Sequence, residues 1–242
     1  MEAIKTVDLT KQYKDVTAVD GLNLEVGQGE LFSLLGVNGA GKTTTVKMLS
    51  CLTQPTSGDA FLNGKSVRTQ TADVKAVIAV SPQEMAVAPG LTVRENLELI
   101  CGVYGFSKDK RNTKIAELTQ LLGLQKVLQK KAGKLSGGWQ RRVSIAMALI
   151  TEPEILFLDE PTLGLDVLAR SDLWELIRSL KGRVTMILTT HYMEEAEALS
   201  DRIGIMKDGK LLICGTAGQI KKAANTENFE QAFIRIVKGV EK

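Results

Sequence analysis

The segment from Gly36 to Thr43 constrains the fold of this chain more than any other. Its sequence, Gly-Val-Asn-Gly-Ala-Gly-Lys-Thr, fits the pattern GxxxxGK[ST], in which glycines let successive backbone N–H groups turn inward around a phosphate. The apolar run Leu31 to Leu35 precedes it and the helix-like run Lys42 to Leu49 follows it. A glycine-rich loop between a strand and a helix N-terminus predicts an α/β fold with a phosphate-binding site.

Two residues of this loop are expected to do more than shape the backbone. Lys42 can reach the β- and γ-phosphates of a nucleotide, and Thr43 offers a hydroxyl to Mg²⁺. The alternative interpretation, a tight glycine turn with an incidental lysine, leaves the flanking strand and helix unexplained. The loop alone leaves kinases, GTPases and motor ATPases open, because it only holds phosphate. The expected nucleotide-binding residues are Gly36, Asn38, Gly39, Ala40, Gly41, Lys42, Thr43 and Thr44.

Short apolar, β-branched runs alternate with helical patterns along the chain. This alternation is typical of an α/β P-loop NTPase core with a mainly parallel sheet flanked by helices. Ligands bind at the carboxyl ends of the strands in such sheets. The predicted strands span Leu31 to Leu35, Val77 to Val80, Ile155 to Leu158, Val184 to Leu188 and Ile203 to Met206.

An N-terminal antiparallel β subdomain and an inserted helical subdomain are expected beside this core. Short strands with turns at Asp20-Gly21 and Gly27-Gln28-Gly29 predict the β subdomain. The helices of the insert are predicted at Leu91 to Tyr104, Asp109 to Leu122 and Ser136 to Ile150, and a last helix at Phe229 to Val237. We therefore expect one domain, residues 1–242, with the α/β core and β flap at 1–88 and 151–224, the helical insert at 89–150 and a short C-terminal helix within 225–242.

The composition excludes several kinds of partner and site. The 31 Lys+Arg and 28 Asp+Glu leave a net charge of only +3 without a basic stripe, so no nucleic acid is expected. Cys51, Cys101 and Cys214 lie far apart, and the single histidine makes a Cys/His metal site improbable; we expect reduced, mostly buried thiols. No signal peptide is evident and no window approaches the roughly 20 apolar residues of a membrane span. Membrane contact is therefore expected only through another subunit.

Two adjacent carboxylates follow the apolar strand Ile155 to Leu158. A buried parallel strand would carry Asp159 and Glu160 to its carboxyl end, beside the phosphate-binding loop. Asp159 would then hold Mg²⁺ through its water shell, and Glu160, pointing the other way, would polarise the attacking water. An isolated Asp-Glu pair is more often a solvated turn, but the apolar run and the loop favour a catalytic role here.

The segment Leu135-Ser-Gly-Gly-Trp-Gln140 opens a helix-like run. Ser136 is a natural N-cap, and Gly137 and Gly138 leave the N–H groups of the first turn uncovered for an anion. An ordinary capped helix start explains the serine. It does not explain two glycines, each of which costs about 1 kcal/mol in a helix interior.

The order of these motifs resembles that of the ATP-binding subunits of ABC transporters over nearly the whole chain. Gly36 to Thr43 is similar to the family's Walker A loop, Leu135 to Gln140 to its LSGGQ signature, and Ile155 to Glu160 to its Walker B strand and catalytic glutamate. The resemblance implies ATP and Mg²⁺ as cofactors. It also implies that Ser136, Gly137 and Gly138 contact nucleotide.

The resemblance adds site residues that no pattern in the chain predicts alone. Gln83 lies where the family has its Q-loop, which implies a catalytic and Mg²⁺-binding role. Asp166 corresponds to the D-loop, His191 to the switch histidine at the γ-phosphate, and Tyr13 to the aromatic residue that stacks on adenine. Trp139 departs from the family, because it stands where a glutamine is frequent and Gln140 follows one place later.

The resemblance also implies partners. The signature of one ATP-binding subunit caps the nucleotide on the loop of a second, in a homo- or heterodimer that powers a separate membrane permease from its cytoplasmic face. The stretch Thr189 to Glu197 and the stretch Pro89 to Asn96 resemble most closely the ATPases of ABC-2 type exporters of sodium and drugs. A candidate socket for the permease lies around Gln83 to Tyr104, with packing inside the insert as the alternative. Its apolar stretch consists of Met85, Ala86, Val87, Ala88 and Leu91.

Two other functions compete with transport. A soluble ABC ATPase acting on ribosomes or DNA usually has two cassettes or a long coiled-coil insertion, and this chain has neither. A P-loop phosphotransferase would leave the signature segment and His191 unexplained.

Overall fold

The computed structural model describes residues 1–239, and its centre is a sheet of six strands in the order β10-β9-β3-β8-β7-β6. The pairs from β9 through β6 are parallel, and β10 pairs antiparallel with β9. The strands are β3 (Leu31–Gly36), β6 (Ile78–Ser81), β7 (Ile155–Asp159), β8 (Thr185–Thr190), β9 (Arg202–Lys207) and β10 (Lys210–Gly215). Every residue of β3, β7 and β8 is buried, as expected for strands covered on both faces.

The predicted parallel sheet is confirmed, with the starts of two strands corrected. Val184, predicted as the start of a strand, lies just before β8, which begins at Thr185. Val77, predicted as the start of a strand, is the last residue of a helix, and the strand begins at Ile78. A short β-branched run fits both elements, so periodicity alone does not separate them.

A second sheet of four antiparallel strands, in the order β2-β1-β4-β5, forms the N-terminal subdomain. The predicted turn at Asp20-Gly21 is wrong, because both residues lie inside β2, and the hairpin turn is at Lys14-Asp15. Gly21 has a φ of 57° where the pairing with β1 shifts register, so its backbone freedom serves a bulge. The strands are β1 (Glu2–Tyr13), β2 (Val16–Gly27), β4 (Ser57–Leu62) and β5 (Lys65–Ser66).

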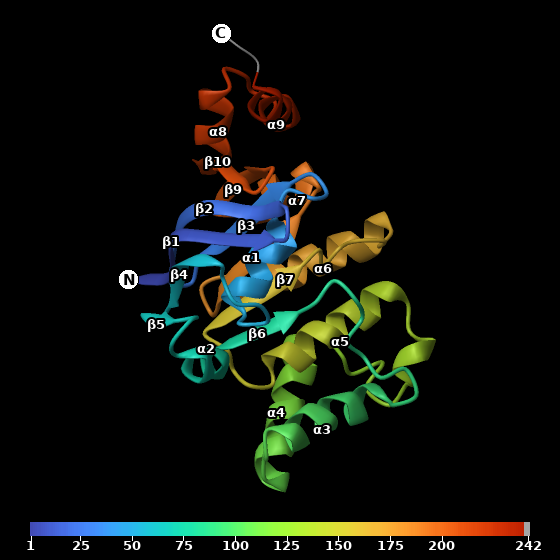
Figure 1. Ribbon diagram of the computed structural model, residues 1–242. Coiled ribbons are helices and arrows are strands. Elements are labelled where there is room, and N and C mark those ends of the chain that lie inside the picture. Colours follow the sequence, from blue (N-terminus) through green and yellow to red (C-terminus); the bar gives the residue numbers. More distant parts are fainter. Residues whose placement is uncertain (240–242) are drawn as a thin grey trace.

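Helices flank the six-stranded sheet and form a separate lobe below it in Figure 1. That lobe consists of α3, α4 and α5, while α8 and α9 lie at the opposite end beyond β10. Helix α1 has the predicted bounds, and the predicted helices of the insert agree with α3 to α5 within about two residues. The helices are α1 (Lys42–Leu49), α2 (Thr71–Val77), α3 (Val93–Val103), α4 (Lys108–Leu121), α5 (Gly137–Leu149), α6 (Val167–Leu180), α7 (Met193–Leu199), α8 (Ala217–Ala223) and α9 (Phe229–Lys238), with a 3₁₀ turn at Ala132–Lys134.

The C-terminal helix predicted at Phe229 to Val237 is observed as α9, which runs one residue further. Residues 240–242, the end of the predicted C-terminal segment, lie outside the described residues. No helix within residues 1–239 is long and apolar enough to cross a membrane.

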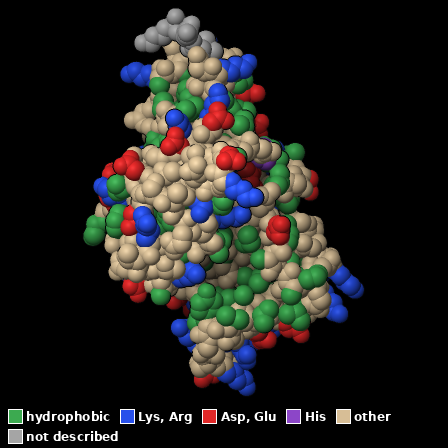
Figure 2. All heavy atoms as spheres, in the orientation of Figure 1, with side chains coloured by type: hydrophobic (Ala, Val, Ile, Leu, Met, Phe, Trp, Pro, Cys, Tyr) green, Lys and Arg blue, Asp and Glu red, His purple; other side chains and the backbone are tan. Residues whose placement is uncertain are grey.

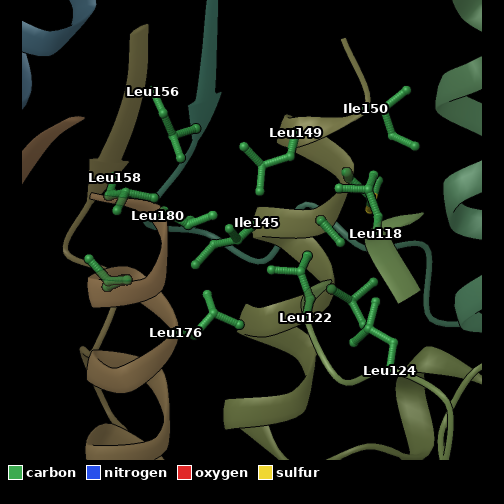
Figure 3. Close-up of a cluster of buried hydrophobic side chains, with 14 of the residues drawn as sticks. Leu118, Leu122, Leu124, Ile145, Leu149, Ile150, Leu156, Leu158, Leu176 and Leu180 are labelled. Carbon is green, nitrogen blue, oxygen red and sulfur yellow. The ribbon is translucent and has the colours of Figure 1, made fainter. Parts of the chain in front are cut away.

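The helical lobe shares one apolar core with the sheet. Figure 3 shows Leu118 of α4 and Ile145 of α5 in a cluster that also contains Leu156 of β7 and Leu176 of α6. Val87 belongs to the same cluster and is only 9% exposed. The predicted socket around Gln83 to Tyr104 is therefore wrong at Val87, whose side chain packs inside the protein.

The three cysteines are free thiols. Cys101 is buried in α3, whereas Cys51 and Cys214 are half-buried, so the expected burial is complete only for Cys101.

Candidate functional site

The phosphate-binding loop joins the end of β3 to the start of α1, and two of its glycines have no room for a side chain. A Cβ on Gly36 would lie 2.5 Å from the carbonyl oxygen of Met206, and a Cβ on Gly41 would lie 2.4 Å from that of Ala18. Gly41 also has a φ of 102°, a backbone conformation that L side chains rarely adopt. These glycines let the loop pass close to neighbouring strands, and they leave the first N–H groups of α1 facing a cavity of about 740 Å³.

Lys42 is folded back onto the loop that carries it. Its ammonium donates to the carbonyl oxygens of Gly36 at 2.8 Å and Val37 at 3.3 Å, and it lies 3.5 Å from Oε1 of Glu160. The side chain is only 6% exposed, and a buried cation must be paired. The carbonyls and the carboxylate together supply that pairing.

Thr43 and Asp159 meet at the edge of the cavity, as the sequence predicts. The Thr43 hydroxyl donates to Oδ1 of Asp159 at 3.3 Å. The hydroxyl of Thr189 also donates to Oδ1, and it accepts a bond from the backbone N–H of Glu160 at 3.0 Å. Thr189 therefore fixes both carboxylate residues from β8, a role that sequence analysis missed because it depends on the pairing of β7 with β8.

Glu160 connects Lys42 to His191. Oε2 of Glu160 lies 2.8 Å from Nδ1 of His191, while Oε1 faces Lys42. A carboxylate only accepts hydrogen bonds, so Nδ1 carries the proton and Nε2 stays available to another group. Glu160 also has a φ of 48°, a left-handed conformation that is uncommon for a non-glycine residue and clusters at functional sites.

The cavity brings together most of the predicted residues. Asn38 to Thr44, Gln83, Glu160 and His191 all line it. The backbone beside Gln83 is held by Arg141 of α5, whose guanidinium donates to the carbonyl oxygens of Pro82 and Gln83. The lining residues that sequence analysis did not identify are Val16, Thr17, Ala18, Leu163 and Asp208.

Tyr13 does not line this cavity. Its side chain is 44% exposed, and the ammonium of Lys11 lies 5.0 Å from the centre of its ring. Stacking of Tyr13 on adenine remains a prediction.

The signature segment lines a separate hollow. Ser136, Gly138 and Asp166 face a cavity of about 230 Å³ between the N-termini of α5 and α6. Ser136 occupies the predicted N-cap position of α5, but its hydroxyl accepts no hydrogen bond from the first turn of the helix. Asp166 does cap α6, because its carboxylate accepts from the N–H of Ala169 at 2.9 Å.

The glycine pair has a packing reason as well as an electrostatic one. A Cβ on Gly138 would lie 2.9 Å from the Cβ of Ala169, so only glycine lets α5 approach α6 this closely. Gln140 points back, donating to the carbonyl oxygens of Ala132 and Leu135. Trp139 instead faces the hollow, with the Arg142 guanidinium 5.0 Å from its ring centre.

A family model described as "ABC transporter" matches residues 19–163, more than half of the chain. The chain belongs to the ABC transporter family. The prediction of an ABC-family ATPase domain with a P-loop NTPase fold is therefore confirmed.

Related proteins include ATP-binding proteins named for multidrug transport and drug resistance. The chain is 40% identical to the probable multidrug ABC transporter ATP-binding protein YbhF of Escherichia coli, over 97% of this chain and 41% of YbhF. It is 39% identical to the daunorubicin/doxorubicin resistance ATP-binding protein DrrA of Streptomyces peucetius, over 91% of this chain and 67% of DrrA. The chain thus spans less than half of the length of YbhF and about two thirds of that of DrrA.

A solved ABC structure shares the fold. An ATP-binding cassette, solved as a dimer in a post-hydrolysis state with ADP and Pi, superposes with a TM-score of 0.77 at 28% identity. The match covers 88% of this chain and 98% of the solved one.

One buried acid of this ABC domain was not predicted. Glu195, in the first turn of α7, is 0% exposed, and its Oε1 accepts from the indole N–H of Trp174 at 3.2 Å. Burial raises its pKa above the ordinary value of 4.5, and the nearby charge of Glu160 adds to that effect. The indole and the hydroxyls of Thr190 and Thr162 only partly oppose the rise in pKa.

The raised pKa of Glu195 predicts a pH-dependent stability. The folded state keeps the proton to higher pH than the unfolded chain, so the unfolding free energy falls as pH rises from about 4.5 through the folded pKa. Glu195→Gln should remove this dependence of the unfolding free energy on pH. The unfolding free energy of the variant relative to wild type should therefore rise by up to about 1.4 kcal/mol per pH unit in that window. Urea unfolding between pH 5 and 8 measures the difference.

A matched control for this experiment is Glu194→Gln. Its side chain is 78% exposed in the same helix turn, so its stability difference from wild type should stay constant with pH. A constant difference for Glu195→Gln would show that Glu195 is ionised in the folded protein.

Proposed function

We propose that this chain binds and hydrolyses ATP with Mg²⁺ and powers a separate membrane permease as a subunit of an ABC-2 type exporter. The observation that carries the proposal is the placement of Glu160 between Lys42 and His191 at the edge of the phosphate-binding cavity. This arrangement puts a base, a cation and an imidazole within reach of one another beside a loop built for phosphates.

The residues present fit Mg²⁺. Thr43 Oγ1 and Asp159 Oδ1 lie 3.3 Å apart beside the loop, and Mg²⁺ prefers such hard oxygen donors with phosphates and waters as its other ligands. Thr43 would hold the ion directly, and Asp159 and Gln83 through water. The ion neutralises charge that develops on the phosphates during transfer.

The protein's own groups account for the remaining chemistry. When phosphates enter, they replace the Gly36 and Val37 carbonyls as the partners of Lys42, because a charged acceptor binds an ammonium more strongly than a neutral one. The phosphates also draw Lys42 away from Oε1 of Glu160, which can then accept a proton from the attacking water while Oε2 keeps its contact with His191. His191, held through Nδ1, presents Nε2 toward the γ-phosphate.

We propose that two such subunits work as a dimer around two nucleotides. The signature residues Ser136 and Gly138 line a hollow distinct from the phosphate-binding cavity, so one chain has two half-sites. A head-to-tail pair would place the signature hollow of each subunit over the phosphate-binding loop of the other. The dimeric state of the solved ATP-binding cassette supports this arrangement.

The permease is proposed to dock on the helical lobe, which places the chain at the cytoplasmic face of the membrane. Leu99 and Val103 of α3 are 49% and 74% exposed, and their spacing of four residues puts them on one face of the helix. Figure 2 shows hydrophobic side chains gathered over this end of the molecule. Export of drugs is supported by the names of YbhF and DrrA.

The test combines hydrolysis with capture of the permease. We expect the purified chain to release phosphate from ATP only with Mg²⁺, and a tagged chain to co-purify from solubilised membranes with a multi-span protein. The double variant Leu99→Asp/Val103→Asp should lose that protein and keep its basal hydrolysis.

Leu212→Asp is the matched control, since Leu212 is 42% exposed on β10, far from the helical lobe in the fold. Equal capture by the double variant and wild type would move the docking surface elsewhere. Absence of both hydrolysis and a membrane partner would contradict the proposed function.

A further inference from the structure

We propose that Glu195 is a positioning residue for ATP hydrolysis, which holds the turn carrying His191 against α6 and the loop that follows Glu160. This inference rests on the proposed ATPase activity. Glu195 lies four residues after His191, in the first turn of α7, with no exposed surface. A buried acid at this position needs a reason, because burying a carboxyl group costs free energy unless neighbouring groups satisfy it.

The carboxyl group lies where three elements meet. Its Oε1 accepts from Trp174 of α6 at 3.2 Å. Thr190, the last residue of β8, and Thr162, in the loop after Glu160, both lie close enough for their hydroxyls to act on its pKa. Both threonines are buried, at 0% and 2% exposure, so this is a dry polar junction inside the protein.

Each of these neighbours is connected to a residue of the catalytic cavity. The hydroxyl of Thr190 accepts from the N–H of Tyr192 at 2.9 Å, which shapes the turn around His191. Thr162 lies two residues after Glu160, and its carbonyl accepts from Leu165 at 3.1 Å as the loop turns toward α6. A displacement at Glu195 therefore moves both ends of the 2.8 Å contact between Glu160 and His191.

The burial of Glu195 and the nearby charge of Glu160 favour the neutral form of the acid. Within residues 1–239, Oε2 of Glu195 and the hydroxyl of Thr162 are buried without a hydrogen-bond partner. A protonated carboxyl group offers a donor at Oε2, whereas a second carboxylate beside Glu160 would add repulsion between like charges. The guanidinium groups of Arg170 and Arg178 lie over the Trp174 ring, 5.6 and 6.0 Å from its centre, and the hydrogen bond to Glu195 comes from the indole.

The experiment compares Glu195→Ala, which removes the carboxyl group, with Glu195→Gln, which replaces it with a neutral amide of similar shape. Steady-state phosphate release gives kcat and KM for ATP, and thermal melting follows folding. We expect Glu195→Ala to lower kcat about tenfold with KM changed less than about threefold, because misplacing catalytic groups slows the chemical step more than binding. Glu195→Gln should retain kcat within about threefold of wild type, since an amide also accepts from Trp174 and donates to its neighbour.

Two further variants keep the test decisive. Glu194→Ala, exposed in the same turn, should behave as wild type. Trp174→Phe removes the indole donor and keeps an aromatic ring at the position. It should lower kcat several-fold without a matching rise in KM, even if Glu195→Ala does not fold. Restored kcat in Glu195→Gln beside reduced kcat in the deletion variants supports positioning by a neutral group.

Other outcomes overturn the inference. Wild-type kcat in folded Glu195→Ala or in Trp174→Phe would show that the junction does not position the site. Equal loss in the Gln and Ala variants would show that the carboxylate is required. A parallel fall of kcat, ATP affinity and melting temperature would indicate a purely structural residue. An inactive wild type would instead overturn the proposed function, and this inference with it.

Discussion

Glu160→Gln is expected to bind ATP as wild type does and to lose nearly all turnover. The amide preserves the shape of the side chain and can still contact His191 and Lys42, but it cannot accept a proton from water. Loss of a general base reduces rates by roughly 100- to 10,000-fold. Phosphate release measures the loss, and titration of a fluorescent ATP analogue measures binding. Because ATP is the bridge between subunits in the proposed dimer, light scattering should detect a dimer that persists with ATP.

Glu152→Gln is a closely matched control for this variant. Glu152 also has a left-handed backbone, with a φ of 54°, but its side chain is 66% exposed and pairs with Lys114. It should therefore hydrolyse ATP normally. Turnover by Glu160→Gln at the rate of this control would remove Glu160 from the reaction.

Lys42→Ala and Ser136→Arg are expected to fail in different ways. Removing the buried ammonium deprives the phosphates of their charged partner, and the loss of about 2–5 kcal/mol typical for such groups weakens ATP binding by roughly 30-fold or more. Ser136→Arg should leave ATP affinity of the monomer unchanged within about twofold, because Ser136 does not line the phosphate-binding cavity. It should still abolish hydrolysis by blocking the other half-site. Isothermal titration of dilute protein and phosphate release separate the two defects.

Ser107→Arg provides the control for this pair. Ser107 is exposed and caps α4 by accepting from Lys110, so its replacement disturbs a helix start without reaching either hollow. Hydrolysis should continue. If Ser136→Arg weakened monomer binding as much as Lys42→Ala, the signature would act on the nucleotide of its own chain, against the proposed dimer.

Sequence analysis was most accurate for the parts of the site that are formed by one continuous stretch of the chain. Helix α1 has the predicted bounds, since the glycine-rich loop and the helix it opens are one continuous segment. The same holds for Asp159 and Glu160, which a buried strand carries to the sheet edge. Glu160 lines the cavity with the loop, as predicted, and Asp159 contacts Thr43 beside it. Their catalytic roles remain predictions, and the variant Glu160→Gln tests that of Glu160.

Contacts between segments that are far apart in the chain could not be predicted from the sequence. Thr189 touches Asp159 only because β8 pairs with β7, and the burial of Glu195 depends on the packing of α7 against α6. The same limit explains the errors. The dipeptide Asp20-Gly21 is typical of a hairpin turn. In the structure it lies inside β2, at a bulge in the pairing of β2 with β1. Val87 stands in a stretch of apolar residues, and only the packed lobe shows that its side chain faces inward.

The contacts of Lys42 with its own loop have a kinetic consequence for the proposed ATP hydrolysis. An ammonium bonded to the carbonyl oxygens of Gly36 and Val37 braces the loop from within, so the protein itself sets the shape of the loop. Arriving ATP exchanges one set of partners for another and does not first have to order a disordered segment. Most of the entropic cost of ordering the loop is then met during folding, and in the proposed cycle we expect nucleotide exchange to be limited by encounter and by product release.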